Sequence, residues 1–439
     1  MKFSIPSPFS IALGLTAIVF TLALVFTIPD NLSTIGHLTN LSEFWFNSFW
    51  SFNDFTMHMV MILVLGHMLA LSPMVNRFVF WFISLFNNMA VATASVAFAT
   101  LVVSFINWGL GLVFGAVLAR LLGEYAQAHK KELNYALVGA AGFCGLMVWH
   151  GGLSGSAPLT VAKDGHGLVD QIGVIPISET VFSNENLILS LVILILVPLF
   201  FFFSAKRVKT ENIKDYKLQL KTENSPLNTL KTKRVNILLM VFGLGMLIIA
   251  FAQFIKSYQS TGNLSSALNL SFVNFVLYGT TLLFLGNAKR FDWALNDAIL
   301  SATGILVQFP LYAGIMGVMK ESGLMVMMAE GFISISNENS FGLFTYLSAA
   351  SVNLFVPSGG GQWLVQGEVV VSAAQALNVP VSKSIMALCY GDQLTNMIQP
   401  FWALPLLGIT KIPAKKILPH TFKLMLLGLI VYGIAIVLW

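Results

Sequence analysis

Charged residues are scarce in this sequence, because Asp, Glu, Lys and Arg make up only 10% of its 439 residues, whereas 56% are hydrophobic. A single aqueous core cannot hide that much apolar surface, so a soluble globular protein is excluded. The uncharged residues form continuous blocks rather than short alternating segments, which excludes an outer-membrane barrel. Most blocks are near or above the roughly 20 residues that a helix needs to cross hydrocarbon. The sequence therefore predicts an all-α polytopic membrane protein.

Cysteine is almost absent, and Cys144 and Cys389 both lie inside or beside apolar blocks. A free thiol there behaves as a small hydrophobe, so we expect packing rather than a disulfide. The sequence also lacks HExxH, CxxC and GxxxxGKS, so it supports neither a zinc protease nor an ATP-driven pump. The segment LSGSA has the form of a nucleophile loop, but it follows an apolar helix instead of a buried strand. We expect no cofactor and no enzymatic activity.

Positive residues gather between the apolar blocks, most densely in residues 204–234. Since cytoplasmic loops of membrane proteins carry an excess of Lys and Arg, we expect this segment to be a cytoplasmic linker between two halves. The same bias places the N-terminus, Arg77 and Arg120 on the cytoplasmic side of an inner membrane. The net charge of +5 therefore reflects membrane topology and does not indicate a nucleic-acid partner.

The uncharged block of residues 78–119 has positive residues at both ends, so it must enter and leave the membrane on one side. FINWGLG lies at its centre, and Asn107, Trp108 and Gly109 supply the polar amide, the bulky ring and the flexible backbone position that a hairpin tip needs. The alternative is one long helix in which Asn107 bonds a neighbouring helix. We therefore predict a hairpin whose tip is NWG.

Two other blocks are interrupted by Gly, Ser and Pro, in WHGGLSGSAPLTVA (149–162) and VPSGGGQWLVQGE (356–368). An interrupted helix frees backbone groups, and at bilayer depth these are tolerated only where they are buried in protein or line a wet cavity. We therefore predict two broken helices, with SGGGQW as an unwound segment.

Polar motifs follow the same order in both halves: NWG, GLSGSAP and ETVFSNEN, then QFP, PSGGGQW and GDQLTNMIQPFW. The comparison pairs Asn107 with Gln308, Ser154 with Ser358, and Thr180 with Thr395. Internal duplication of interrupted helices is a sequence pointer to a transporter site. The positions of the charges alone favour parallel rather than inverted halves.

INWGLG, WHGGLSGSAPL, ATGILVQFPLYAGIMG, FVPSGGGQWLVQG and GDQLTNMIQPFWALPLLGI resemble the signature stretches of the short-chain fatty acid transporter family, of the acetoacetate and butyrate permease type. The resemblance implies the fold of the ion transporter superfamily, with about 9–11 transmembrane helices, two re-entrant hairpins and two broken helices in an inverted repeat. By that resemblance NWG and QFP are the hairpin tips, and GLSGSAP and PSGGGQW are the helix breaks. Glu368 departs from the family pattern.

The resemblance further implies a secondary active transporter of small monocarboxylates, coupled to a proton or sodium ion, in the lipid bilayer and as a homodimer. The five motifs contain no Lys or Arg, which suits one negative charge better than two. A transporter of another organic anion such as a C4 dicarboxylate, a membrane-embedded hydrolase and a channel are the alternatives. The expected parts are 1–54 (N-terminal helix and external loop), 55–203 (first transport repeat), 204–234 (linker), 235–410 (second transport repeat) and 411–439 (C-terminal helix).

Candidate substrate-binding residues offer hydrogen-bonding groups to a carboxylate or an apolar surface to a short chain. They are Asn107, Ser154, Ser156, Gln308, Tyr312, Ser358, Gly359, Gly360, Gly361, Gln362, Trp363, Thr395 and Gln399. The expected apolar wall consists of Phe309, Tyr312, Trp363, Phe401 and Trp402.

Candidate ion-coupling residues are Asp392, Asn396 and His150. Asp392 lies between apolar flanks, and acids inside a membrane are costly enough that function is the first hypothesis. His150 stands beside the first break, and histidine is the usual proton-exchanging side chain. A sodium ion would lie near Asn107 and Asn396, where helix breaks also expose carbonyl groups.

Overall fold

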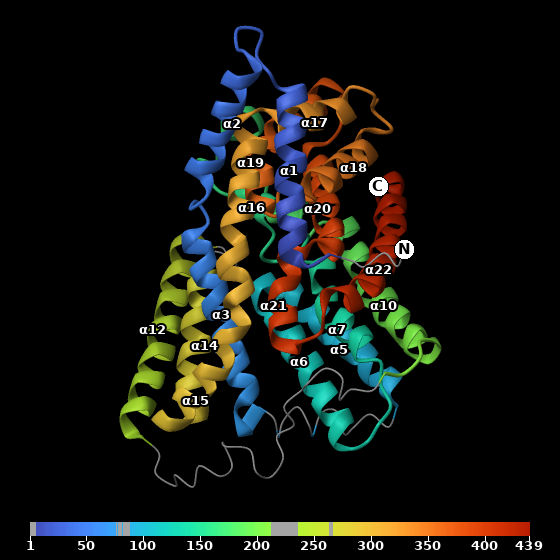
Figure 1. Ribbon diagram of the computed structural model, residues 1–439. Helices are drawn as coiled ribbons and strands as arrows, with labels where there is room; N and C mark the ends of the chain where they lie inside the picture. Colours follow the sequence, from blue (N-terminus) through green and yellow to red (C-terminus); the bar gives the residue numbers. More distant parts are fainter. Residues whose placement is uncertain (1–5, 76, 78–80, 82–87, 212–235, 263–266) are drawn as a thin grey trace.

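The computed structural model describes residues 6–75, 77, 81, 88–211, 236–262 and 267–439. Within these residues every regular element is a helix (Figure 1), apart from an isolated bridge between Leu133 and Glu211. The all-α prediction is therefore confirmed. Most of the expected linker, residues 212–234, lies outside the described residues, and its first four residues belong to a helix that ends at Arg207.

Eight helices of the described residues are long and apolar enough to cross a membrane. They are α1 (Pro8–Phe26), α3 (Asn53–Leu71), α5 (Met89–Ile106), α6 (Trp108–Ala128), α10 (Asn184–Arg207), α12 (Ile237–Thr261), the column α15–η4–α16 (Ala288–Ile299, Leu300–Ala302, Thr303–Glu321) and α22 (Ala414–Leu438). Shorter apolar helices are α7 with η1 (Tyr135–Phe143, Cys144–Met147), α14 (Leu270–Leu285), α17 (Leu324–Ile333) and α21 (Pro400–Thr410). The remaining elements are α2 (Thr34–Ser48), α8 (Ser156–Val161), α9 (Val169–Ile172), η2 (Ile177–Glu179), α18 (Phe341–Asn353), α19 (Gly359–Ala376), α20 (Val381–Thr395) and η5 (Asn396–Ile398).

Ser and Asn side chains set the start of many of these helices. The capping residues are Ser7, Ser33, Asn88, Asn107, Asn134, Ser183, Asn236, Asn269, Asn287 and Ser358, each accepting a hydrogen bond from a backbone N–H in the first turn. The first N–H groups of a helix have no intrahelical acceptor, and in an apolar environment water cannot supply one. These caps therefore fix where the interrupted helices restart.

The predicted first hairpin is present, and Asn107 forms its tip. Asn107 has extended backbone angles between α5 and α6, and its Oδ1 accepts from the N–H of Leu110 at 2.9 Å. The two helices run antiparallel in close contact, since a Cβ at Gly111 or Gly115 would meet Ser104 or Thr100 of α5.

The second hairpin is not at QFP, and that prediction is wrong. Residues 308–310 lie inside the continuous helix α16, where Pro310 does not interrupt the helix. Neighbouring helices in a membrane protein re-satisfy the backbone groups that a proline frees, so proline alone does not make a tip. The second hairpin is α18–α19, joined through residues 354–358.

Ser358 is the structural counterpart of Asn107. Both cap the second helix of a hairpin, with φ and ψ of −150° and 119° at Asn107 and −154° and 100° at Ser358. They stand 251 residues apart, since 358 − 107 = 251. The three glycines after Ser358 belong to the first turn of α19, so the expectation that they are unwound is also wrong.

Each hairpin is followed by a broken helix. In the first half α7 and η1 stop at Met147, and the chain restarts as α8; in the second half α20 and η5 are followed by Gln399 and α21. The two 3-10 turns begin at Cys144 and Asn396, 252 residues apart by subtraction. The pairings of Ser154 with Ser358 and of Thr180 with Thr395 therefore join unlike elements. In Figure 1 the labels of α5, α6 and α7 lie in the lower part of the view and those of α18, α19 and α20 in the upper part.

The part expected to hold the N-terminal helix and an external loop, residues 1–54, contains a second helix, α2, after α1. This helix packs along α16, where Gly314 and Gly317 leave space for Trp45 and Ser48. Close helix approach at small residues is the usual way for helices to associate in membranes.

Arg120 is buried, although the charge pattern placed it at a cytoplasmic loop. Its Nε donates to Glu124 Oε1 at 2.8 Å, and a second guanidinium nitrogen contacts His67. His67 in turn lies 3.4 Å from Asp297 of α15. These four residues join α3, α6 and α15.

We expect Arg120→Gln to destabilise the protein, because it leaves the carboxylate of Glu124 buried without its cation. Breaking a buried ion pair on one side costs about 3–5 kcal/mol. Thermal unfolding in detergent, followed by circular dichroism, measures the effect. Arg207→Gln is the matched control, since Arg207 is exposed at the end of α10. Equal melting temperatures for the two variants would show that the cluster contributes no stability.

Candidate functional site

The tip of the first hairpin lies against the first helix break. The N–H of Leu153 donates to the carbonyl of Phe105 at 2.7 Å, and the N–H of Trp108 donates to Ser154 Oγ at 3.0 Å. A Cβ at Gly152 would lie 2.5 Å from the Phe105 oxygen, so this approach requires glycine. The hydroxyl group of Ser154 therefore stabilises the tip of the first hairpin. The amide of Asn107 is also engaged, since its Nδ2 donates to the carbonyl of Leu268 at 2.8 Å.

His150 and Asp392 form a buried pair, which we call the dyad. His150 Nδ1 lies 2.6 Å from Asp392 Oδ2, and both side chains are at most 1% exposed. His150 belongs to the first break, and Asp392 to α20, which precedes the second break. The N–H of His150 also donates to the side-chain oxygen of Gln393 at 3.2 Å. The structure thus joins two residues that the sequence suggested separately.

The tautomer of His150 follows from its second hydrogen bond. Its Nε2 accepts from the N–H of Ala157 in α8 at 3.2 Å, so this nitrogen carries no proton. A neutral imidazole then carries its proton on Nδ1 and donates it to Asp392. The other oxygen, Asp392 Oδ1, is buried without a hydrogen-bond partner among the described residues. An unpaired oxygen on a buried carboxylate is costly, because it has lost its hydrogen bonds to water and gained none from the protein.

The start of α19 lies directly against the dyad. A Cβ at Gly359 would lie 2.7 Å from the Trp149 ring, 2.8 Å from His150 Cε1 and 3.2 Å from Asp392 Oδ2. A Cβ at Gly360 would have its nearest neighbour, Ser156, at 3.7 Å. The N–H groups of Gly359 and Gly360 have no intrahelical acceptor, as at the beginning of any helix. The positive end of an 18-residue helix therefore meets a carboxylate inside the apolar core.

A set of amide and hydroxyl groups adjoins the dyad, and we call this set the amide cluster. It consists of Asn353, Gln362, Thr395, Asn396 and Gln399. Asn353 Nδ2 lies within 2.9 Å of the carbonyl of Asp392, Thr395 Oγ1 and Asn396 Oδ1. The side-chain oxygens of Asn353, Gln362 and Gln399 are buried without donors among the described residues. The cluster thus has more oxygen acceptors than this part of the protein satisfies.

Six aromatic rings pack beside the dyad and form the aromatic cluster. They are Phe55, Trp108, Trp149, Phe309, Phe401 and Trp402. The rings of Phe309 and Phe401 stack at 4.0 Å, and Trp108 meets Trp402 edge to face at 5.1 Å. Trp149 joins the cluster to the dyad, because its ring stacks on His150 at 4.4 Å. Within the described part of the chain, the buried indole nitrogen of Trp149 has no hydrogen-bond partner.

Several predicted site residues therefore converge, and others do not. Gly359 adjoins the dyad and Gly360 adjoins α8, Ser358 caps the same helix, and Phe401 and Trp402 lie in the aromatic cluster. Gln308 and Tyr312 lie on α16, each with a buried polar atom that no described residue bonds. Trp363 packs on Gly367 of its own helix, and Glu368 is exposed. Four site residues were not predicted: Trp149, Trp108, Phe55 and Asn353. For two of them the sequence offered a signal, because Trp149 is adjacent to His150 and Trp108 is adjacent to Asn107.

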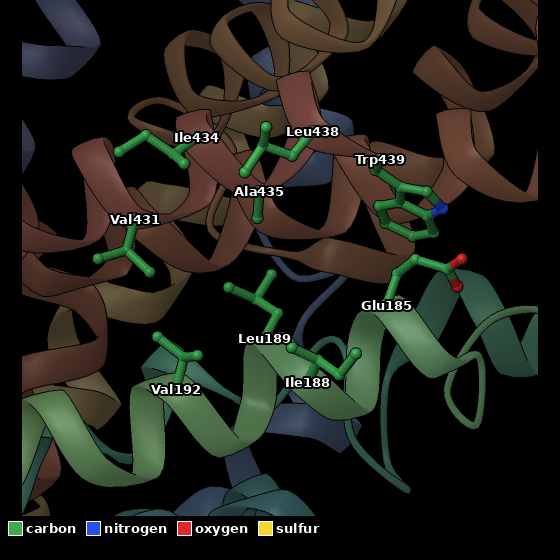
Figure 2. Close-up of a pocket in the computed structure, with 9 residues that line it drawn as sticks. All are labelled: Glu185, Ile188, Leu189, Val192, Val431, Ile434, Ala435, Leu438 and Trp439. Atoms are coloured by element: carbon green, nitrogen blue, oxygen red, sulfur yellow. The ribbon is translucent and has the colours of Figure 1, made fainter.

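A separate groove of about 400 Å³ runs between α10 and α22 (Figure 2). Its walls are aliphatic, with Glu185 and Trp439 at one end, and Ile188, Ile434 and Leu438 are exposed. A groove of this composition on the outside of a membrane protein suits lipid chains. It offers too few donors for a carboxylate, so the dyad and its surroundings are the candidate site.

Interrupted helices that bring a buried acid, a histidine and unpaired amides together inside an apolar core define a class of protein, the multi-pass membrane transporters. The sequence profile of the short chain fatty acid transporter family matches residues 1–439. The chain belongs to this family. It is therefore a membrane transporter for short-chain fatty acids and not an enzyme.

Curated relatives and solved structures resemble almost the whole chain. An Escherichia coli K12 protein named "Putative short-chain fatty acid transporter" is 32% identical over 446 residues, covering 99% of this chain and 96% of the relative. A Haemophilus influenzae Rd protein of the same name is 36% identical over 427 residues, covering 94% and 92%. The solved YdaH transporter of Alcanivorax borkumensis has a TM-score of 0.49 and 15% identity, covering 99% of this chain and 98% of that chain. MtrF of Neisseria gonorrhoeae has a TM-score of 0.44 and 13% identity, covering 99% and 95%.

Proposed function

We propose that this transporter is a cation-coupled symporter of small monocarboxylates such as acetoacetate and butyrate. The observation that carries the proposal is the dyad at the start of α19, where a buried acid whose Oδ1 is unpaired among the described residues meets a helix N-terminus. Accumulating an anion against an inside-negative potential costs about 2.3 kcal/mol per 100 mV. A bound cation that travels with the anion removes this cost.

The substrate carboxylate binds at the N-terminus of α19 in this proposal. The N–H groups of Gly359 and Gly360 donate to it, and the helix dipole favours its negative charge. Ser156 stands opposite Gly360 on α8 and supplies a hydroxyl. The motifs around this position contain no Lys or Arg, so a single negative charge is matched by dipoles alone.

The dyad couples the substrate to a proton through charge repulsion. When Asp392 is ionised, its negative charge already occupies the positive end of α19. At a separation of about 5 Å and an effective dielectric constant of about 20, a second anion is repelled by about 3 kcal/mol, or roughly a hundredfold in affinity. Protonation of Asp392 Oδ1 removes the repulsion, while His150 keeps its hydrogen bond to Oδ2. Substrate and proton therefore bind together.

The aromatic cluster receives the acyl chain. Its rings adjoin the dyad through Trp149 and provide an apolar wall. Each buried CH₂ group contributes about 0.8 kcal/mol, which suffices to prefer a short chain over a bare carboxylate. The stacked pair Phe309 and Phe401 limits the length of the chain.

Sodium is a second candidate for the coupling ion, and the amide cluster favours it. Sodium binds oxygen ligands, and the amide cluster, in which Asn353 donates to the backbone carbonyl of Asp392, holds three amide oxygens that have no donor among the described residues. In this variant of the proposal the ion neutralises Asp392 in place of the proton. Asn396 contributes through its hydrogen bond with Asn353, whereas the amide of Asn107 is used by the hairpin tip.

The same proposal includes an inverted repeat in the inner membrane, with the N-terminus in the cytoplasm. The near-constant offsets of 251 and 252 residues support a repeat, and the opposite positions of the two hairpins in Figure 1 support its inversion. The hairpins of the proposed repeats are aligned through Asn107 and Ser358, which lie inside the expected parts 55–203 and 235–410, and a homodimer is the expected assembly.

Uptake of labelled butyrate and acetoacetate into proteoliposomes tests the function, with the pH gradient, sodium gradient and voltage imposed separately. Initial rates must be compared with those of protein-free vesicles, because undissociated acid that diffuses through lipid reaches the same equilibrium as one-proton symport. We expect saturable uptake that one cation gradient accelerates. Saturable flux insensitive to both gradients would overturn the symport proposal, and no flux of either acid would overturn the choice of substrates.

A further inference from the structure

The hydroxyl group of Tyr312 stands out among the buried tyrosines. The side chain is fully buried, and its oxygen has no hydrogen-bond partner among the described residues. Other buried tyrosines of the helical core donate to a protein oxygen; these are Tyr135, Tyr346, Tyr390 and Tyr432. Buried polar groups in proteins are almost always paired, so an exception points to a ligand that supplies the partner.

Tyr312 lies between the aromatic cluster and the proposed carboxylate position. On α16 the residues Phe309, Tyr312 and Met316 follow the spacing of one helix face. Phe309 stacks on Phe401, and Tyr312 meets the same ring edge to face at 5.1 Å. The sulfur of Met316 would lie 3.1 Å from a Cβ at Gly361, in the first turn of α19. Tyr312 is therefore one helical turn along α16 from the residue that adjoins the first turn of α19.

We infer that the Tyr312 hydroxyl donates a hydrogen bond to an oxygen on the acyl chain of the substrate, and so selects 3-oxo acids over unsubstituted ones. This inference rests on the proposed function. Four residues of helix span about 6 Å along the axis, which is comparable with the length of a four-carbon acid. A carboxylate at α19 then places the third carbon of the chain near Tyr312.

The chemistry explains why a tyrosine would be present in an otherwise apolar wall. A phenylalanine would serve an unsubstituted chain equally well and would bury no hydroxyl. A site built to bond a substrate oxygen discriminates against the analogue that lacks it, because the buried group of the protein then stays unpaired. The single hydroxyl of Tyr312 thus suffices to convert a wall for butyrate into a site for a 3-oxo chain.

The test is the ratio of transport efficiencies for 3-oxobutanoate and butanoate, measured as kcat/KM in proteoliposomes. Tyr312→Phe keeps the ring and its contact with Phe401 and removes only the hydroxyl. We expect the ratio to fall about fivefold to tenfold, which corresponds to the loss of one net hydrogen bond. Tyr346→Phe is the matched control, because that hydroxyl bonds the carbonyl of Leu429 on α22, and its ratio should equal that of the wild type.

The outcomes separate this inference from the function on which it rests. If the wild-type protein carries both acids and Tyr312→Phe leaves the ratio unchanged, the Tyr312 hydroxyl does not recognise the oxygen on the acyl chain. An equal loss for both acids in Tyr312→Phe would show a purely structural role and would also overturn the inference. If the wild-type protein carries neither acid, the proposed function itself fails. Competition by 3-hydroxybutanoate provides an independent readout. In Tyr312→Phe this competition should weaken together with the transport of 3-oxobutanoate.

Discussion

Asp392→Asn is expected to abolish uptake of butyrate driven by a cation gradient while preserving exchange of internal for external butyrate. Asparagine has nearly the same shape as the carboxylic acid and is permanently neutral, so it mimics the loaded form of the dyad. The anion then binds without repulsion, but the empty carrier has lost the group that must release its ion. For a proton-coupled carrier, substrate affinity should also lose its dependence on pH, which the roughly hundredfold repulsion otherwise imposes.

Two measurements on the same proteoliposomes check this expectation. Gradient-driven initial rates report net uptake, and loading with unlabelled butyrate at equal pH and sodium reports exchange. Glu368→Gln is the matched control, because it removes an acid from the exposed side of α19 and should leave both rates unchanged. Net uptake at the wild-type rate in Asp392→Asn would exclude Asp392 as the coupling group, whichever cation is used.

The first hairpin could be predicted because its signal is local. Asn107 stands at the centre of an uncharged block and caps the helix that follows it. A polar amide is costly in the middle of such a block, and Gly109 follows it two residues later, so a turn of the chain is the natural place for it. The first break is equally local, since Gly152 must admit the carbonyl of Phe105 at close range. In both places the residue that interrupts the helix also makes the contact that holds the interruption.

The second half is harder to predict because neither glycine nor proline specifies one outcome: glycine permits many conformations, and proline, although its φ is fixed, occurs both in membrane helices and at their breaks. Pro310 stays within a helix whose neighbours support it, and the glycines after Ser358 begin a helix instead of unwinding one. The capping pattern is the better signal, since a Ser or Asn at the start marks the second helix of both hairpins.

The dyad and the aromatic cluster could not be predicted from the sequence as assemblies. His150 and Asp392 are 242 residues apart, and nothing in either segment specifies the other. Phe55 lies in α3, far in sequence from Phe309 and Phe401, and aromatic residues are too common in this chain to single it out. Periodicity and capping identify elements, whereas the contacts between elements depend on the fold.

Gly359→Ala is expected to reduce transport by about tenfold to a hundredfold, although the substitution adds a single methyl group. The added carbon would lie 2.7 Å from the Trp149 ring and 2.8 Å from His150 Cε1, which is too close for either ring. These rings stack on one another, and His150 is held by Asp392 and Ala157, so they cannot move independently. Overpacking of this kind costs about 1–3 kcal/mol. Here the added methyl group would push His150 and Asp392, the two partners of the dyad, apart.

Gly433→Ala is the matched control for adding a methyl group to a helical glycine. A Cβ at Gly433 of α22 would have no atom of the described residues within 4 Å, so no atom has to move. Alanine also stabilises a helix by roughly 0.5–1 kcal/mol relative to glycine, so this variant should be at least as stable as the wild type and should transport at the wild-type rate. Initial rates of butyrate uptake, normalised to purified protein, compare the two variants. Equal losses would mean that the loss in Gly359→Ala does not arise from contact with the dyad, whereas a loss confined to Gly359→Ala would place the transport site at the junction of α19, His150 and Asp392.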